Sequence, residues 1–457
     1  MQSDTTRAKW GTLISCSLSC FIGWLDFAIV NTALPAIAKD LSASLIQLQW
    51  VINAFILALA VTIVTLGRIS DLYGRRLVNI IGVSLFGLSS LCAGLAASPE
   101  WLVFFRMLQG VANAAIIPSA MALIFHAFPA NERGKAIGIW SAFVSLGMAL
   151  GPVVGGIFVS ALSWRWIFYI NVPISLISVI VSLLFARESR SEEGSRRIDW
   201  KGVCLMTMGL VFLVGGLMHA PDWGWENIKT WGSLGVAVIA LLWFYRSEIK
   251  STSPTIPFAL FANRGFLYST MVIVCLMFVF TAAIFLMPQY LMNIRHEEPY
   301  IAGLMLLPIT VCIALFSPFV GRMVDKFSVK ILMLIGLILY LGSTVMQIGF
   351  AIATSPYFIL LSFALMGLGF AFARNSGTTK ALASAPHHLA GTAAGVLWTA
   401  QNTGGALSIA ITVTLFRTIY ESTSTPASFL VGYHSAMWLL SAVILATILI
   451  LLFAFKK

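Results

Sequence analysis

Two ionisable residues, Asp26 and Arg106, lie within long apolar runs of the sequence. An ionised side chain at the centre of a membrane costs about 2.5–3.5 kcal/mol on insertion scales, so each needs a partner, water or a function. Asp26 is the only acidic residue deep within any of these runs. Burial favours the protonated carboxyl, whereas a nearby arginine favours the ionised one. The pair is therefore a candidate proton-binding site, with a static structural ion pair as the alternative.

Asp26 and Arg106 are expected at similar depths. Asp26 stands about nine residues before the external end of its run near Pro35, and Arg106 about six residues after the external start of its own run. At 1.5 Å per residue these positions lie roughly 13 and 9 Å from the external side. Because this difference is smaller than the reach of an arginine side chain, the two groups are expected to share one aqueous cavity.

Other polar and aromatic residues within the runs are candidates for the walls of a substrate cavity. A cavity that accepts several amphipathic compounds needs broad apolar and aromatic walls with a few polar groups. The candidates are Trp24, Asn31, Gln109, Asn113, Trp140, Arg374, Trp398 and Gln401. Gln109, Trp140 and Trp398 are favoured, and ordinary helix packing is the alternative for each candidate. Arg374 either faces the cavity and attracts an anionic group or extends to the inner interface.

The elements that position these residues are predicted to be membrane-spanning helices. Of the 457 residues, 59% are hydrophobic and 10% are charged, whereas a soluble domain carries about 25% charged residues. Fourteen runs approach the roughly 20 apolar residues that a helix needs to cross a bilayer, and the thirteenth covers 391–416. Alternating strand patterns are absent from the sequence. We therefore expect an all-α membrane protein with 14 transmembrane helices arranged as 6+2+6.

The distribution of basic residues supports an even number of spans. With both termini cytoplasmic, 21 of the 28 Lys and Arg residues fall on the cytoplasmic side and five on the external side. Such an excess is the positive-inside signal. The net charge of +11 is thus explained by topology and by contact with the anionic lipids of the inner leaflet, and nucleic acid is not an expected partner. The predicted location is the cell inner membrane.

An internal repeat divides the chain. The segment GRISDLYGRR at 67–76 recurs as GRMVDKFSVK at 321–330, an offset of 254 residues, and a second loop pattern recurs at an offset of 257. Two homologous bundles of six spans are therefore predicted at 1–186 and 265–457, with a two-helix insert and its flanking loops at 187–264. Parallel halves around a central site are a transporter design.

The chain resembles members of the major facilitator superfamily, in the fourteen-span drug:proton antiporter group of quaternary-ammonium and Emr-type exporters. Residues 67–76 resemble motif A of the superfamily, and 106–110 (RMLQG) resemble motif B. Residues 147–156 (GMALGPVVGG) resemble motif C, the antiporter signature. Residues 25–35 (LDFAIVNTALP) and 163–173 (SWRWIFYINVP) are similar to further segments of the fourteen-span group.

The resemblance implies two mechanical parts. The motif A loop would form a charge network that holds the cytoplasmic side closed, although a solvated basic loop is the alternative. Its residues are Gly67, Arg68, Asp71, Gly74, Arg75 and Arg76, with Asp325 in the second copy. The motif C span would act as a tightly packed hinge, although close packing alone also explains it. Its residues are Gly147, Gly151, Pro152, Gly155 and Gly156.

The expected function is proton-coupled export of small amphipathic, drug-like compounds by alternating access. A dedicated exporter of one metabolite, such as a siderophore or an amino acid, is the alternative, and a non-transporting membrane sensor is a further one. The sequence has no Walker loop, nucleophile elbow or metal-ligand spacing, so neither an enzyme nor a cofactor is expected. The expected partners are a small-molecule substrate, protons and the lipid bilayer, and the sequence leaves the need for a periplasmic adaptor open.

Overall fold

The computed structural model describes residues 2–129, 132–190, 199–251, 254–324, 326–385, 390–420 and 425–454, and the regular elements in these ranges are all helices. Thirteen of the helices in the described ranges are long and apolar enough to cross a membrane. The expected all-helical membrane architecture is confirmed. Asp325, which was predicted to contribute to the cytoplasmic gate from the second copy of motif A, lies outside the described residues.

The chain forms two compact units, Met1–Val203 and Cys204–Lys457. The helices of the first unit are α1 (Gln2–Asp40), α2 (Leu45–Tyr73), α3 (Arg75–Gly94), α4 (Pro99–Ala127), α5 (Arg133–Ala161), α6 (Trp166–Tyr169) and α7 (Asn171–Phe185). Helix α8 (Trp200–Trp223) begins at the boundary between the units. The three-part division at 187 and 265 stays a prediction.

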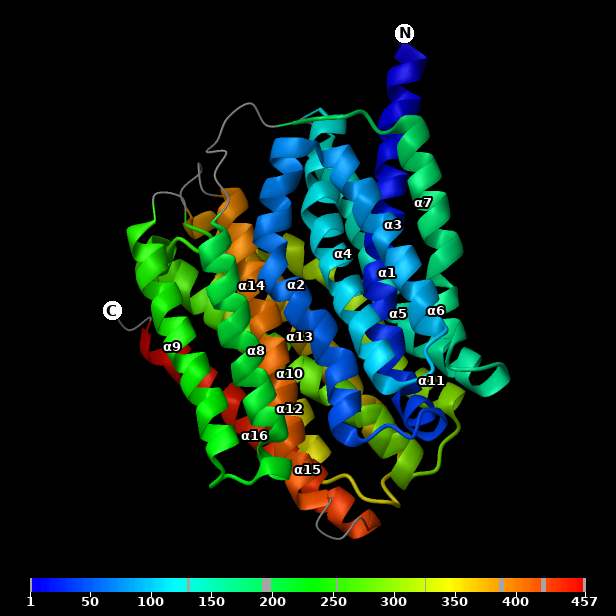
Figure 1. Ribbon diagram of the computed structural model, residues 1–457, viewed down its shortest axis with the longest axis vertical. Helices are drawn as coiled ribbons and strands as arrows, with labels where there is room; N and C mark the ends of the chain where they lie inside the picture. Colours follow the sequence, from blue (N-terminus) through cyan, green and yellow to red (C-terminus); the bar gives the residue numbers. More distant parts are fainter. Residues whose placement is uncertain are drawn as a thin grey trace. The chain divides into compact units, whose positions relative to one another are not determined.

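The second unit contains the remaining helices. They are α9 (Ile228–Lys250), α10 (Arg264–Gln289), α11 (Pro299–Val324), α12 (Val329–Ile348), α13 (Pro356–Ser384), α14 (Ala390–Ser408), α15 (Thr414–Tyr420) and α16 (Pro426–Ala454). Helices α8 and α9 lie side by side (Figure 1), and the Ser233 hydroxyl donates to the Phe212 carbonyl between them at 2.8 Å.

Short polar signals set the helix boundaries in the first unit. Helix α2 begins with a capping box, in which Ser44 and Gln47 satisfy each other's backbone N–H groups. The Ser98 side chain accepts from the N–H group of Trp101 at the start of α4, and Pro99 occupies the first turn. Gly74 separates α2 from α3 with φ +124°, a conformation that favours glycine.

The predicted span 391–416 is a helical segment that changes geometry along its length. Helix α14 is followed by a π-helical turn, Ile409–Val413, and then by α15. Helix α14 contains four Gly and three Thr residues among its 19, and it is not among the thirteen helices described above as long and apolar enough to cross a membrane. The chain nevertheless stays helical from 390 to 420.

Candidate functional site

Asp26 and Arg106 form a buried ion pair in the first unit. Asp26 lies on α1 with 0% of its surface exposed, and Arg106 lies on α4 with 1% exposed. The Nη1 atom of Arg106 donates to Oδ2 of Asp26. The Nε atom of Arg106 donates to the Val51 carbonyl of α2 at 3.1 Å. The guanidinium also lies over the Phe55 ring, 4.5 Å from its centroid. The charged groups are thus placed inside the helix bundle.

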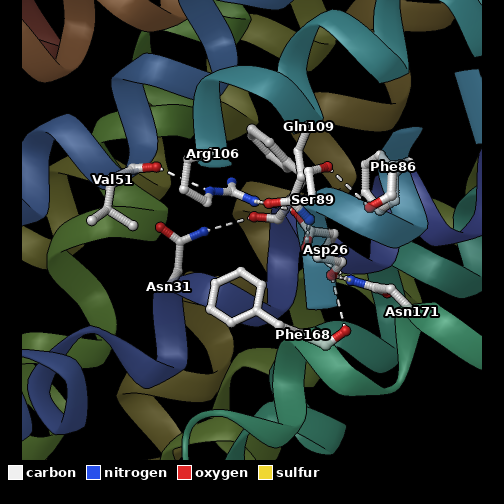
Figure 2. Close-up of polar contacts among 11 residues, drawn as sticks. Asp26, Asn31, Val51, Phe86, Ser89, Arg106, Gln109, Phe168 and Asn171 are labelled. Carbon is white, nitrogen blue, oxygen red and sulfur yellow. Dashed lines mark hydrogen bonds and ion pairs between the residues drawn. The ribbon is translucent and has the colours of Figure 1, made fainter. Parts of the chain in front are cut away.

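Two side-chain amides complete the surroundings of the carboxylate (Figure 2). Gln109 lies one turn after Arg106 on α4, accepts from Nη1 of Arg106 at 2.9 Å and donates to Oδ1 of Asp26 at 3.2 Å. Asn171, the first residue of α7, donates to Oδ1 of Asp26 at 2.9 Å and to Ser90 Oγ at 3.0 Å. The carboxylate therefore receives hydrogen bonds from side chains of α4 and α7.

Asn171 was not predicted to belong to the site. The available signal was an amide side chain inside the predicted span 166–186, within the segment 163–173 that carries part of the resemblance. Its position at the first residue of α7 follows the turn after α6. Only Ile170, with helical backbone angles, separates α6 from α7. The contact between Asn171 and Asp26, 145 residues apart, depends on tertiary packing.

The motif A loop is held by a residue that follows α7. Asp71 accepts from Arg75 Nε at 2.8 Å. The Glu188 carboxylate accepts from the backbone N–H groups of Arg76 and Leu77 at 3.0 and 3.1 Å. The N–H groups in the first turn of a helix have no acceptor within the helix, and a negative charge at this position is stabilising. Glu188 was not predicted, because its distance of 111 residues from Leu77 in the sequence hides the contact.

The motif C glycines lie against α1, and Figure 1 shows α5 beside α1. A Cβ atom on Gly147 would lie 2.6 Å from the Phe21 carbonyl oxygen, and one on Gly151 would lie 2.5 Å from Ala28 Cβ. Gly155 faces the side chain of Thr32. Pro152 lies inside α5, and Gly156 is buried. Close helix approach is present at these glycines, while bending at this point stays a prediction.

The predicted cavity residues divide between the two units. In the first unit, Trp24, Asn113 and Trp140 are buried, and the Asn31 amide donates to the Phe27 carbonyl of its own helix at 2.9 Å. Gln109 belongs to the ion-pair network described above. For Trp24, Asn31, Asn113 and Trp140 a cavity-lining role stays a prediction.

In the second unit, the guanidinium of Arg374 on α13 lies over the Trp398 ring of α14, 5.8 Å from its centroid. Gln401, also on α14, is buried. Within the described residues, no group of three or more His, Cys, Asp or Glu side chains could hold a metal ion.

Comparisons with known proteins agree with this architecture. The family model described as Major Facilitator Superfamily matches residues 16–409. The tetracenomycin C resistance and export protein of Streptomyces glaucescens is 34% identical over 402 residues, covering 88% of this chain and 75% of the relative. The multidrug resistance protein Stp of Mycobacterium tuberculosis is 34% identical over 406 residues, covering 89% and 75%. A solved POT family transporter in complex with a thioalcohol conjugated peptide has a TM-score of 0.74 at 14% identity, covering 98% of this chain and 96% of that chain.

Proposed function

The chain belongs to the major facilitator superfamily, and we propose that it is a proton-coupled antiporter that exports small amphipathic compounds by alternating access. It is a multi-pass membrane transporter related to multidrug resistance exporters. The predictions of the family, of the membrane fold and of a transporter rather than an enzyme are therefore confirmed. The proton, the direction of transport and the substrate class are the parts that we propose.

The observation that carries the proposal is the fully buried Asp26 carboxylate with Arg106, Gln109 and Asn171 around it. A proton that adds to a carboxylate oxygen removes the negative charge that holds the guanidinium. Arg106 would then keep the Val51 carbonyl and the Gln109 oxygen as acceptors. Because Asp26 is 0% exposed here, proton entry requires another conformation, as alternating access supplies.

The proton would enter from the external side and leave to the cytoplasm, which restores the ion pair. If the substrate and the proton occupy the open cavity alternately, each inward movement of a proton is coupled to outward movement of a substrate molecule. The motif A loop, held to Glu188 in this structure, would act as the cytoplasmic latch. The close contact of α5 with α1 would be the hinge. The positive-inside bias supports placement in the inner membrane with both termini cytoplasmic.

The test replaces Asp26 by Asn and measures proton-driven efflux from proteoliposomes under an imposed pH gradient. The dye is chosen from cationic, neutral and anionic dyes that the wild-type protein exports. Asn keeps the shape and cannot carry the proton, so gradient-driven efflux is expected to fall to the level of protein-free vesicles. Efflux down a dye gradient, with no pH gradient, checks that the variant is folded and able to move the dye.

A matched control is Asp40→Asn, on the same helix but at its exposed end. This control is expected to keep gradient-driven efflux, because Asp40 pairs with Arg165 outside the buried network. Wild-type coupling in the Asp26→Asn protein would remove Asp26 from the mechanism.

A dedicated exporter of one compound is the second candidate function. It is favoured by the relative from Streptomyces glaucescens, whose name refers to tetracenomycin C. Efflux measured over a panel of unrelated dyes, antibiotics, siderophores and amino acids separates the two candidates. Export of a single class only would favour the dedicated exporter.

A further inference from the structure

The guanidinium of Arg374 lies against aromatic rings of α13 and α14. Arg374 lies ten residues before the last residue of α13, Ser384. Its Cζ atom lies 5.4 Å from the centroid of the Phe370 ring, four residues nearer the start of the helix. Side chains on a helix tilt toward its N-terminus, and this one follows that direction. Because the charge is directed away from the end of α13, extension to the inner interface does not explain its position.

Two aromatic rings lie against the charge, and a side-chain amide is on the same side of α14 as one of them. The Arg374 guanidinium lies over the ring of Phe370 and, on α14, over the ring of Trp398. Gln401 follows Trp398 by three residues and therefore lies on the same side of α14. Its Nε2 atom is buried and has no hydrogen-bond acceptor within the described part of the chain. A buried donor left unsatisfied costs about 1–3 kcal/mol, which a ligand oxygen would offset.

The helices around this cluster carry positive charge. The sequences of α10 through α16 contain no Asp or Glu, whereas α13 contributes both Arg374 and Lys380. The low dielectric of a helix bundle strengthens the attraction between Arg374 and a ligand of opposite sign.

We propose that Arg374, Phe370, Trp398 and Gln401 form a binding site for the acidic group of a flat, conjugated anion, such as an aromatic carboxylate or phenolate. The planar guanidinium can bind a carboxylate through two parallel hydrogen bonds. The Phe370 and Trp398 rings provide flat apolar surfaces for a conjugated ring system. The inference rests on the proposed export function and specifies its substrate as anionic rather than quaternary ammonium.

The test uses two dyes with one xanthene frame and opposite charge, anionic fluorescein and cationic rhodamine 123. Binding to purified full-length protein in detergent is measured by fluorescence anisotropy, which requires no proton gradient. The variants are Arg374→Gln, Arg374→Lys and Gln401→Leu, and Lys380→Gln is the control that removes a charge from the same helix. Proteoliposome efflux of both dyes is measured alongside.

Fluorescein is expected to bind the wild-type protein more tightly than rhodamine 123. Loss of a charged hydrogen bond weakens binding about tenfold or more, so Arg374→Gln is expected to lower the fluorescein affinity by at least that factor. The same variant should leave rhodamine 123 unchanged. Arg374→Lys should lose less, Gln401→Leu should weaken fluorescein, and Lys380→Gln should affect neither dye.

Equal losses for both dyes in Arg374→Gln would overturn the proposal, since they indicate a structural role. Preferential binding of rhodamine 123 by the wild type, or binding of neither dye, would also overturn it. The outcome is separable from the Asp26 experiment. A coupling failure in the Asp26→Asn vesicles leaves equilibrium dye binding intact, and a failed dye discrimination leaves proton-driven efflux of another compound intact.

Discussion

The contact between α5 and α1 predicts that Gly151→Ala separates these two helices. The new Cβ would lie 2.5 Å from Ala28 Cβ, 3.0 Å from the Ile29 nitrogen and 3.1 Å from the Ala28 carbonyl carbon. Ordinary contacts of a Cβ atom begin at 3.4 Å, so α5 must move by about 1 Å, an overpacking that costs roughly 1–3 kcal/mol. None of these three atoms can rotate away, because two are backbone atoms and the third is a Cβ.

The assay is thermal unfolding of the detergent-solubilised protein. A cost near 2 kcal/mol lowers the melting temperature of a unit of this size by about 4–8 °C. The double variant Gly151→Ala with Ala28→Gly removes the shortest contact and is expected to recover part of the loss. The contact of the new Cβ with the Ile29 nitrogen remains, so the recovery should be incomplete.

Gly138→Ala on the same helix is the matched control. A Cβ at Gly138 meets no heavy atom within 4 Å, and alanine has the higher helix propensity. Its melting temperature is therefore expected to stay constant or rise. Equal melting temperatures for Gly151→Ala and Gly138→Ala would refute the close packing of α5 on α1.

Two further predictions concern helix ends. Gly74→Ala places a side chain at φ +124° and a Cβ 2.7 Å from the Glu188 carboxylate. A stability loss of about 1–3 kcal/mol is therefore expected in the same melting assay. An unchanged melting temperature would contradict the inference that this turn requires glycine. Arg417, buried on α15, pairs with Asp222 of α8 and donates to the Met218 carbonyl at 3.3 Å. Arg417→Leu should raise hydrogen exchange in the last turns of α8 about tenfold or more, and exchange equal to that of the wild type would show that Arg417 does not hold α8.

The sequence was sufficient to identify the membrane helices and the charged pair. A run of about 20 apolar residues crosses the lipid as a helix, because a helix satisfies its backbone hydrogen bonds within the segment itself. Depth along a helix scales with residue number, so Asp26 and Arg106 could be placed at similar depths before their contact was known. The glycine spacing at 147, 151 and 155 likewise predicted a close helix approach.

The tertiary structure decided which groups meet. Asn171 and Glu188 complete the carboxylate site and the motif A loop from positions more than 100 residues away, and no local periodicity encodes such contacts. The partner of the α5 glycines is α1, which spacing alone left open. For Arg374, the sequence allowed the side chain to face the cavity or to extend to the inner interface. The contacts of its guanidinium with the rings of Phe370 and Trp398 favour the first direction. Local sequence sets which face of a helix is polar, but the direction and partner of each polar side chain follow from how the helices pack.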